Sequence, residues 1–241
     1  MQINRRHLIL TGMAGIAARP LLAAPDTALV AVASNFAKVA ALLQPVFEAE
    51  TGYRITLSSG STGQLFAQVL TGAPYDLFLA ADQWRPQRLE EAGLSLARRT
   101  YARGLLALWR PAGEASEAAL RSENYAHLAI ANPALAPYGR AAKEALEALG
   151  LWERLQPRIV IGQNVGQAFA LVASGNAQMG LVAQSFTLGQ GESWQVPEAL
   201  YEPILQDAVL LRDSPAAAAF MDFLASEKAQ EIIHTSGYGA L

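Results

Sequence analysis

The chain has 241 residues, of which 52% are hydrophobic and 16% are charged. This composition excludes intrinsic disorder, and the absence of a long apolar run excludes a membrane-spanning channel or permease. The chain contains no Cys, which excludes disulfides, thiolate metal sites and a cysteine nucleophile. The formal net charge is −3 and no basic cluster follows the N-terminus, so we expect no nucleic-acid partner.

Residues 1–24 have the pattern of an export signal. The pair Arg5-Arg6 precedes an apolar stretch at residues 8–18, and the segment ends in small residues. An apolar stretch of this length is too short to span a membrane, and adjacent arginines favour the twin-arginine route over an ordinary secretory signal. We therefore expect an exported, soluble, periplasmic protein. Residues 1–24 hold three arginines and no acidic residue, so their removal leaves 15 basic and 21 acidic residues.

Strand and helix patterns alternate after the signal. Short apolar runs predict strands, and apolar residues spaced three and four apart predict helices. The expected strands are residues 29–33, 53–57, 76–80, 104–109, 128–131, 159–161, 179–182 and part of 201–211. The expected helices are residues 36–50, 65–70, 88–92, 139–149, 166–173, 216–224 and 227–234. This alternation indicates an α/β fold in which helices cover parallel strands.

The order of these elements predicts two lobes. No Gly/Ser/Pro-rich linker divides the chain, but strands near 104–110 and 205–211 bracket the second series of strands and helices. One lobe is expected to comprise residues 25–105 and 210–241, and the other residues 106–209. The chain then crosses twice between the lobes, which makes a two-strand hinge with a ligand cleft beside it.

Four turns between a strand and a helix carry small or polar residues. They are Ser34-Asn35 and residues 60–63, 137–139 and 164–166. A helix start has unpaired backbone N–H groups and about half a positive charge, so it can bind an anion. Any one of these turns could be a plain helix cap. Together they predict a site in which neutral donors bind a fully ionised tetrahedral oxyanion.

Residues that would favour an enzyme are mostly absent. There is no GxSxG elbow, P-loop, GxGxxG or HExxH motif. A secreted serine hydrolase with Ser34 or Ser61 as nucleophile remains a remote alternative, because no histidine follows a strand end to act as its base. Asp76 and Asp82 flank a strand, where capping or ion pairing is expected rather than metal binding. We expect a binding protein without cofactors, catalytic residues or direct metal-ion ligands.

Longer segments resemble the periplasmic molybdate-binding proteins of ABC transporters. The similar segments occur in the same order along the whole chain after the signal: GSTG at 60–63, GAPYDLF at 72–78, NP at 132–133, APYG at 136–139, NVGQA at 164–168 and GY at 237–238. The resemblance implies a type II periplasmic binding-protein fold with two βα lobes. It also implies that molybdate or tungstate is held in the cleft and passed to a membrane permease. Sulfate or another small oxyanion is the alternative ligand. We expect the protein to be a monomer.

The resemblance also implies which residues bind the oxyanion. Ser34 matches the family's first hydroxyl, and Thr62 stands where the family has a Ser, with Ser61 as a weaker candidate. The third and fourth contacts are the backbone N–H groups of Tyr138 and Val165.

A fifth contact varies within the family. Some members supply a Tyr hydroxyl at the position of Ala183, which has none. This departure favours a subgroup in which the residue after the first hydroxyl, here Asn35, adds a backbone donor.

Overall fold

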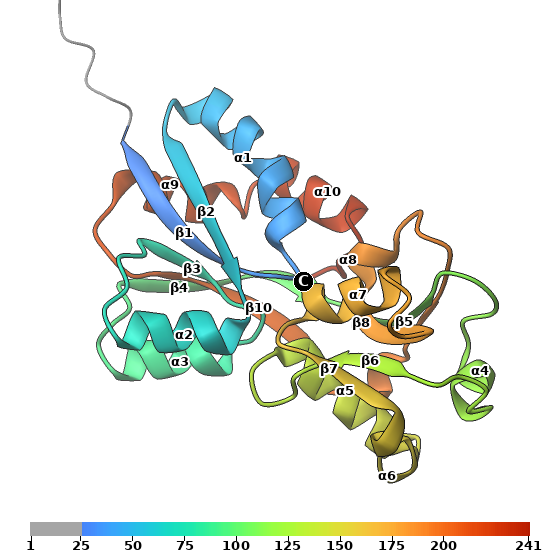
Figure 1. Cartoon of the computed structure of the whole chain (residues 1–241). Helices are drawn as coiled ribbons and strands as arrows, with labels where there is room; N and C mark the ends of the chain where they lie inside the picture. Colours follow the sequence, from blue (N-terminus) through green and yellow to red (C-terminus); the bar gives the residue numbers. More distant parts are fainter. Residues whose placement is uncertain (1–25) are drawn as a thin grey trace, which may run out of the picture.

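Two five-stranded sheets form in residues 26–241, the part of the chain that the computed structural model describes (Figure 1). The first sheet has the order β2-β1-β3-β10-β4, with β1 (Thr27–Ala33), β2 (Arg54–Gly60), β3 (Leu77–Leu79), β4 (Ala97–Gly104) and β10 (Ile204–Leu210). The second has the order β7-β6-β8-β5-β9, with β5 (Leu106–Arg110), β6 (Leu128–Ala131), β7 (Ile159–Gly162), β8 (Met179–Ala183) and β9 (Glu192–Gln195). The predicted export signal lies outside the described residues.

Helices accompany both sheets. With the first sheet are α1 (Ala37–Thr51), α2 (Thr62–Leu70), α3 (Trp84–Glu91), α9 (Pro215–Phe223) and α10 (Glu227–Thr235). With the second are α4 (Glu117–Arg121), α5 (Pro137–Ala148), α6 (Trp152–Leu155), α7 (Val165–Ala173) and α8 (Gln184–Thr187), and short 3-10 turns occur at Gln156–Arg158 and Glu198–Leu200. Within residues 26–241, none of the helices combines the length and the apolar character needed to cross a membrane.

Strand β1, which lies between β2 and β3, is buried on both faces, as expected for a parallel strand covered by helices. Val30 and Val32 pack in the cluster formed with α1, α9 and α10. Ala31 points to the opposite face and packs with Leu65 of α2 and Phe78 of β3. The apolar run that predicted this strand is therefore explained by helices on both sides of the sheet.

Parallel pairing places the predicted helix starts in pairs. β1 pairs in parallel with β2, with Ala33 opposite Gly60, and β6 pairs in parallel with β7, with Ala131 opposite Gly162. The carboxyl ends of parallel strands meet at one edge of a sheet, where α/β proteins bind their ligands. The turns before α1 and α2 consequently share one edge of the first sheet, and those before α5 and α7 share one edge of the second.

The chain crosses between the sheets from β4 to β5 and again from β9 to β10. The prediction of one strand over residues 104–109 is wrong, because Gly104 pairs with Ile204 in the first sheet whereas Leu106 pairs with Ala183 in the second. The lobes predicted at residues 25–105 with 210–241 and at 106–209 stay a prediction. Strand β10 belongs to the first sheet. By strand membership alone, the second lobe therefore ends before Ile204 rather than at residue 209.

Candidate anion-binding site

Ser34 brings the turn after β1 against two other helix starts. Its backbone N–H donates to the carbonyl of Gly60, at 2.9 Å, in the turn that leads to α2. Gly166, the second residue of α7, packs against the same serine: a Cβ built on Gly166 would lie 3.6 Å from Ser34 Cβ and 3.9 Å from its hydroxyl oxygen. Ser34 therefore lies where the edge of the first sheet meets a helix start of the second.

Gly63 joins the start of α2 to the turn before α5. Its backbone N–H donates to the carbonyl of Leu135 at 2.9 Å, and a Cβ at position 63 would lie 2.8 Å from that oxygen. The contact needs glycine because a side chain would collide with backbone. Arg85 reinforces it by donating to the carbonyl of Ala134 at 3.1 Å. These contacts bring all four predicted helix starts together at the junction of the two sheets.

Two of the helix starts have side-chain caps. Ser61 is the N-cap of α2: its hydroxyl accepts from the N–H of Gln64 at 3.2 Å, and the Gln64 side chain accepts from the N–H of Ser61 at 3.4 Å. This reciprocal pair is a capping box. Asn164 caps α7 by accepting from the N–H of Gln167 at 2.9 Å. Ser61 thus has a structural task, whereas its neighbour Thr62 is the first residue of the helix.

At this junction, four backbone N–H groups have no acceptor within residues 26–241. They belong to Asn35, Thr62, Tyr138 and Val165, whose residues are 1%, 1%, 1% and 3% exposed. A buried N–H that lacks an acceptor is rare and costs about 1–3 kcal/mol. Four such groups at one junction make a site that an anion with several acceptor oxygens could satisfy.

Two hydroxyl groups accompany these amides. Thr62 Oγ1 accepts from the N–H of Ala81 at 3.3 Å, which leaves its own proton available for donation. Ser34 is half-buried beside Gly166. Ala183 ends β8 fully buried and offers no hydroxyl. Two residues after Ala183, the hydroxyl of Ser185 donates to the carbonyl of Asn35 at 3.5 Å.

The cations around the junction are paired or exposed. Arg85 forms an ion pair with Asp82, which also accepts from the N–H of Arg85 at 3.1 Å. Asp82 therefore has the capping and pairing role that the sequence indicated. Lys38 is exposed and lines a surface groove together with Asn35 and Ser185. Among residues 26–241, no group of three His, Cys, Asp or Glu side chains is placed to hold a metal ion.

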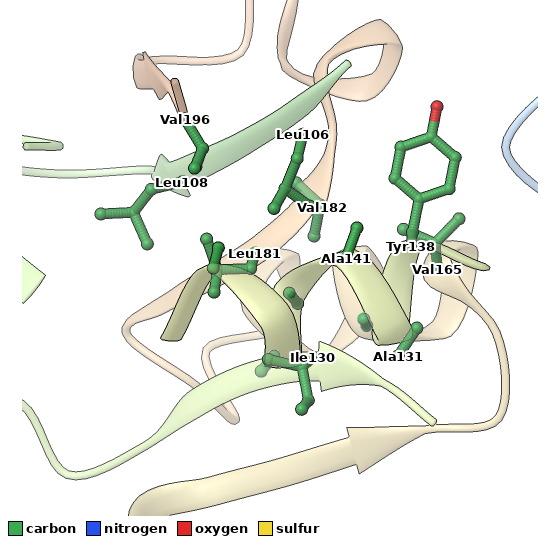
Figure 2. Packing of buried hydrophobic residues seen from close by; sticks show 14 of the residues in the cluster. Leu106, Leu108, Ile130, Ala131, Tyr138, Ala141, Val165, Leu181, Val182 and Val196 are labelled. Carbon is green, nitrogen blue, oxygen red and sulfur yellow. The ribbon is translucent and has the colours of Figure 1, made fainter. Parts of the chain in front are cut away.

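A buried polar network lies behind the amides. Asn35 Nδ2 donates to Gln206 Oε1 and to Tyr238 Oη, both at 3.0 Å, and Tyr238 Oη donates to the carbonyl of Asn35 at 2.9 Å. Figure 2 shows Tyr138 projecting from α5 with its hydroxyl directed away from the helix. Burial, and then the neighbouring Tyr238, raise the pKa of Tyr138 well above its ordinary value, so its hydroxyl stays protonated.

The sequence analysis did not single out Gln206. The signal that could have found it is a pair of polar residues, Gln206-Asp207, inside a strand whose remaining residues are mostly apolar. Both residues are completely buried. Polar groups at such positions are hydrogen-bonded to specific partners, which in this fold come from distant parts of the chain.

An α/β fold of two sheets, with unpaired helix-start amides gathered between them, is typical of a binding protein that holds a small solute at the junction. Residues 28–239 match the family described as bacterial extracellular solute-binding protein, and the chain belongs to this family.

Individual relatives are similar over most of their length. The chain is 41% identical over 237 residues to the molybdate-binding protein ModA of Rhodobacter capsulatus, covering 95% of this chain and 94% of the relative. It is 44% identical over 223 residues to ModA of Azotobacter vinelandii, covering 87% of this chain and 88% of that relative. The solved structure of the Azotobacter vinelandii periplasmic molybdate-binding protein matches with a TM-score of 0.84 and 37% identity, covering 89% of this chain and 99% of that one. The predicted fold class and the predicted resemblance to this group are confirmed.

Proposed function

We propose that this protein captures molybdate outside the cytoplasm and delivers it to the permease of an ABC transporter. The observation that carries the proposal is the set of four buried N–H groups, from Asn35, Thr62, Tyr138 and Val165, that have no acceptor among residues 26–241. The similarity to relatives named as molybdate-binding proteins supports the same ligand. The protein acts by binding and release, and it catalyses no reaction.

Neutral donors select a fully ionised oxyanion. Molybdate has four oxygens, carries two negative charges and has no proton to donate, so every oxygen can accept a hydrogen bond. The proposed contacts are the hydroxyls of Ser34 and Thr62 and the backbone N–H groups of Asn35, Tyr138 and Val165, with Ser61 kept as the cap of α2. A protonated anion would place its hydrogen against donors, and a buried carboxylate would repel the ligand.

The donors come from both sheets, which links binding to closure. Asn35 and Thr62 follow strands of the first sheet, whereas Tyr138 and Val165 follow strands of the second. An anion that contacts both sets stabilises the arrangement in which the lobes touch, and its greater affinity for that arrangement drives closure. The permease then has to separate the lobes in order to take the anion.

Calorimetric titration of the purified protein with molybdate, tungstate and sulfate tests the proposal. We expect one molybdate per chain, similar binding of tungstate because its size and charge are nearly the same, and much weaker binding of the smaller sulfate. Equal affinity for sulfate and molybdate would favour the alternative ligand class. Gel filtration with light scattering, with and without molybdate, tests the expected monomer.

The remote alternative, a serine hydrolase, makes a different prediction. If Ser34 or Ser61 were a nucleophile, Ser34→Ala or Ser61→Ala would abolish turnover of an ester substrate. For a binding site we expect no turnover in the parent protein. We also expect Ser34→Ala to lower affinity by about 1–3 kcal/mol, the amount for one charge-assisted hydrogen bond.

A further inference from the structure

Gln206 occupies a special position in the fold. It is the third residue of β10, directly after the second crossing between the sheets, and it is completely buried. The pairing of β10 with β4 shifts register between Gln206 and Asp207. Such an irregularity re-aims the side chains around it. A neutral amide at this point can donate and accept hydrogen bonds at the same time.

The oxygen of this amide faces the first sheet. Gln206 Oε1 accepts from Asn35 Nδ2 at 3.0 Å and from Tyr101 Oη at 3.1 Å. Asn35 follows β1, and Tyr101 lies on β4. Since Asn35 also bonds to Tyr238, its side chain is held on two sides, and this fixes the backbone N–H that the residue offers to the ligand.

The nitrogen of the same amide faces the second sheet. Gln206 Nε2 donates to Tyr138 Oη at 3.4 Å. Tyr138 is the second residue of α5, so its ring connects the start of that helix to the crossing strands. Gly104, on the first crossing, leaves the room for this contact, because a Cβ there would lie 2.3 Å from Tyr138 Oη.

We propose that Gln206 is a positioning and specificity-determining residue that sets the spacing between the Asn35 and Tyr138 amides, and thereby the size of oxyanion that fits. The inference rests on the proposed function. One side chain is bonded to one ligand-binding residue from each lobe, close to the pivot of closure. Loosening it lets the two amides adopt other spacings, which removes the advantage of the larger anion over the smaller one.

Two variants break this bridge without removing a ligand donor. Tyr138→Phe deletes the hydroxyl but keeps the backbone N–H. Gln206→Met deletes both polar ends at similar volume; Asn35 keeps its bond to Tyr238, and Tyr101 keeps its bond to the carbonyl of Ala80. The matched control is Tyr125→Phe, which deletes another buried hydroxyl of the second lobe, bonded at 2.9 Å to the carbonyl of Leu120.

The measurement is the ratio of molybdate to sulfate affinity, by calorimetry or competition, for the full protein. We expect Tyr138→Phe and Gln206→Met each to lower the ratio by about fivefold, as one hydrogen bond allows. The double variant should lower it little further, since each change alone already breaks the bridge from Asn35 through Gln206 to Tyr138. Tyr125→Phe should keep the parent ratio even if it lowers thermal stability.

The affinity ratios of the variants decide whether Gln206 has the proposed positioning role. An unchanged ratio in both variants, an equal fall in the control, or fully additive losses would overturn the positioning role. If Gln206→Met does not fold, Tyr138→Phe decides alone. The parent protein tests the proposed function separately: if it prefers sulfate, molybdate capture is wrong, while a ratio that shifts in Tyr138→Phe and not in Tyr125→Phe still supports the role of Gln206.

Discussion

Gly104 lies directly against the hydroxyl of Tyr138, so that a Cβ built on Gly104 would be 2.3 Å from Tyr138 Oη and 2.7 Å from Gln206 Nε2. Gly104 is the last residue of β4, on the first crossing between the sheets. Tyr138 is the second residue of α5, which packs with the second sheet. The close approach shows that the start of α5 is packed against Gly104 of β4 and Gln206 of β10.

We predict that Gly104→Ala destabilises the protein, because the added methyl has no free space. Overpacking of this kind costs about 1–3 kcal/mol. Urea unfolding measures the loss, and Gly239→Ala is the control, since a Cβ there would meet Arg103 Cδ at an ordinary 3.4 Å. Adding Tyr138→Phe to Gly104→Ala removes the 2.3 Å contact and should restore part of the stability. Equal losses for Gly104→Ala and Gly239→Ala would contradict the packing argument.

Ser61 and Thr62 are adjacent hydroxyl residues with different expected roles. Thr62→Val should weaken molybdate binding by about 1–3 kcal/mol, because it removes a hydroxyl donor at the proposed site. Thr62→Ser keeps that hydroxyl and should retain most of the affinity. Ser61→Ala should instead lower stability by about 1 kcal/mol through loss of the capping box, with a smaller effect on binding. Calorimetry and urea unfolding of the three variants measure both quantities. A larger affinity loss for Ser61→Ala than for Thr62→Val would reverse the assignment.

Arg98 and Arg99 are neighbours on β4 with different partners. Arg98 lies 2.7 Å from the carboxylate of Asp207, whose side chain is fully buried, whereas Arg99 pairs at 3.1 Å with the exposed Asp222. Arg98→Met leaves a buried carboxylate that retains only the neutral donors Thr100 and Gln83.

We therefore expect Arg98→Met to cost about 2 kcal/mol of stability, less than a fully buried pair because Arg98 itself is partly exposed. Arg99→Met should cost less than about 1 kcal/mol. Urea unfolding of both variants compares them under one condition. Similar losses would show that the buried position of Asp207 does not govern the strength of its ion pair.

Buried tyrosines predict a loss of stability at high pH. Burial raises the pKa of Tyr101 and Tyr138 well above the ordinary value of about 10, and raises that of Tyr125 to about 12. Above pH 10 the unfolded chain loses these protons while the folded protein retains them, so stability falls as pH rises. Below pH 10 both states hold the protons and the effect vanishes.

The slope gives a direct test of this linkage. Each such tyrosine contributes about 1.4 kcal/mol per pH unit between its unfolded and folded pKa values. Tyr138→Phe should therefore make the decline between pH 10 and 11 shallower by about that amount, measured by urea unfolding at several pH values. A decline that is the same in the parent and the variant would mean that Tyr138 ionises equally in the folded and unfolded states.

Sequence reasoning predicted the alternating strands and helices and the small or polar turns that lead into α2, α5 and α7. Ser34-Asn35 lies in the turn before α1, whose N-cap is Phe36. These features are local, because turn residues and apolar spacing depend on neighbours in the chain. Sequence reasoning did not predict that the strand divides after Gly104 into β4 and β5, which belong to different sheets. Residues 104–109 form one apolar run, and such a run does not indicate which strands it pairs with. The same reasoning also placed the start of α3 four residues late, at residue 88 instead of Trp84.

By itself, the sequence determined the order of the elements and the turns that offer backbone amides. It also carried the segments that resemble periplasmic molybdate-binding proteins along the chain. Only the tertiary structure decided that Gly166 packs on Ser34, that Gly63 bonds to Leu135, and that Gln206 connects Asn35 to Tyr138. The reason is physical. A helix start is encoded within a few consecutive residues, whereas contacts across 68 to 171 positions exist only after two sheets have formed and packed together.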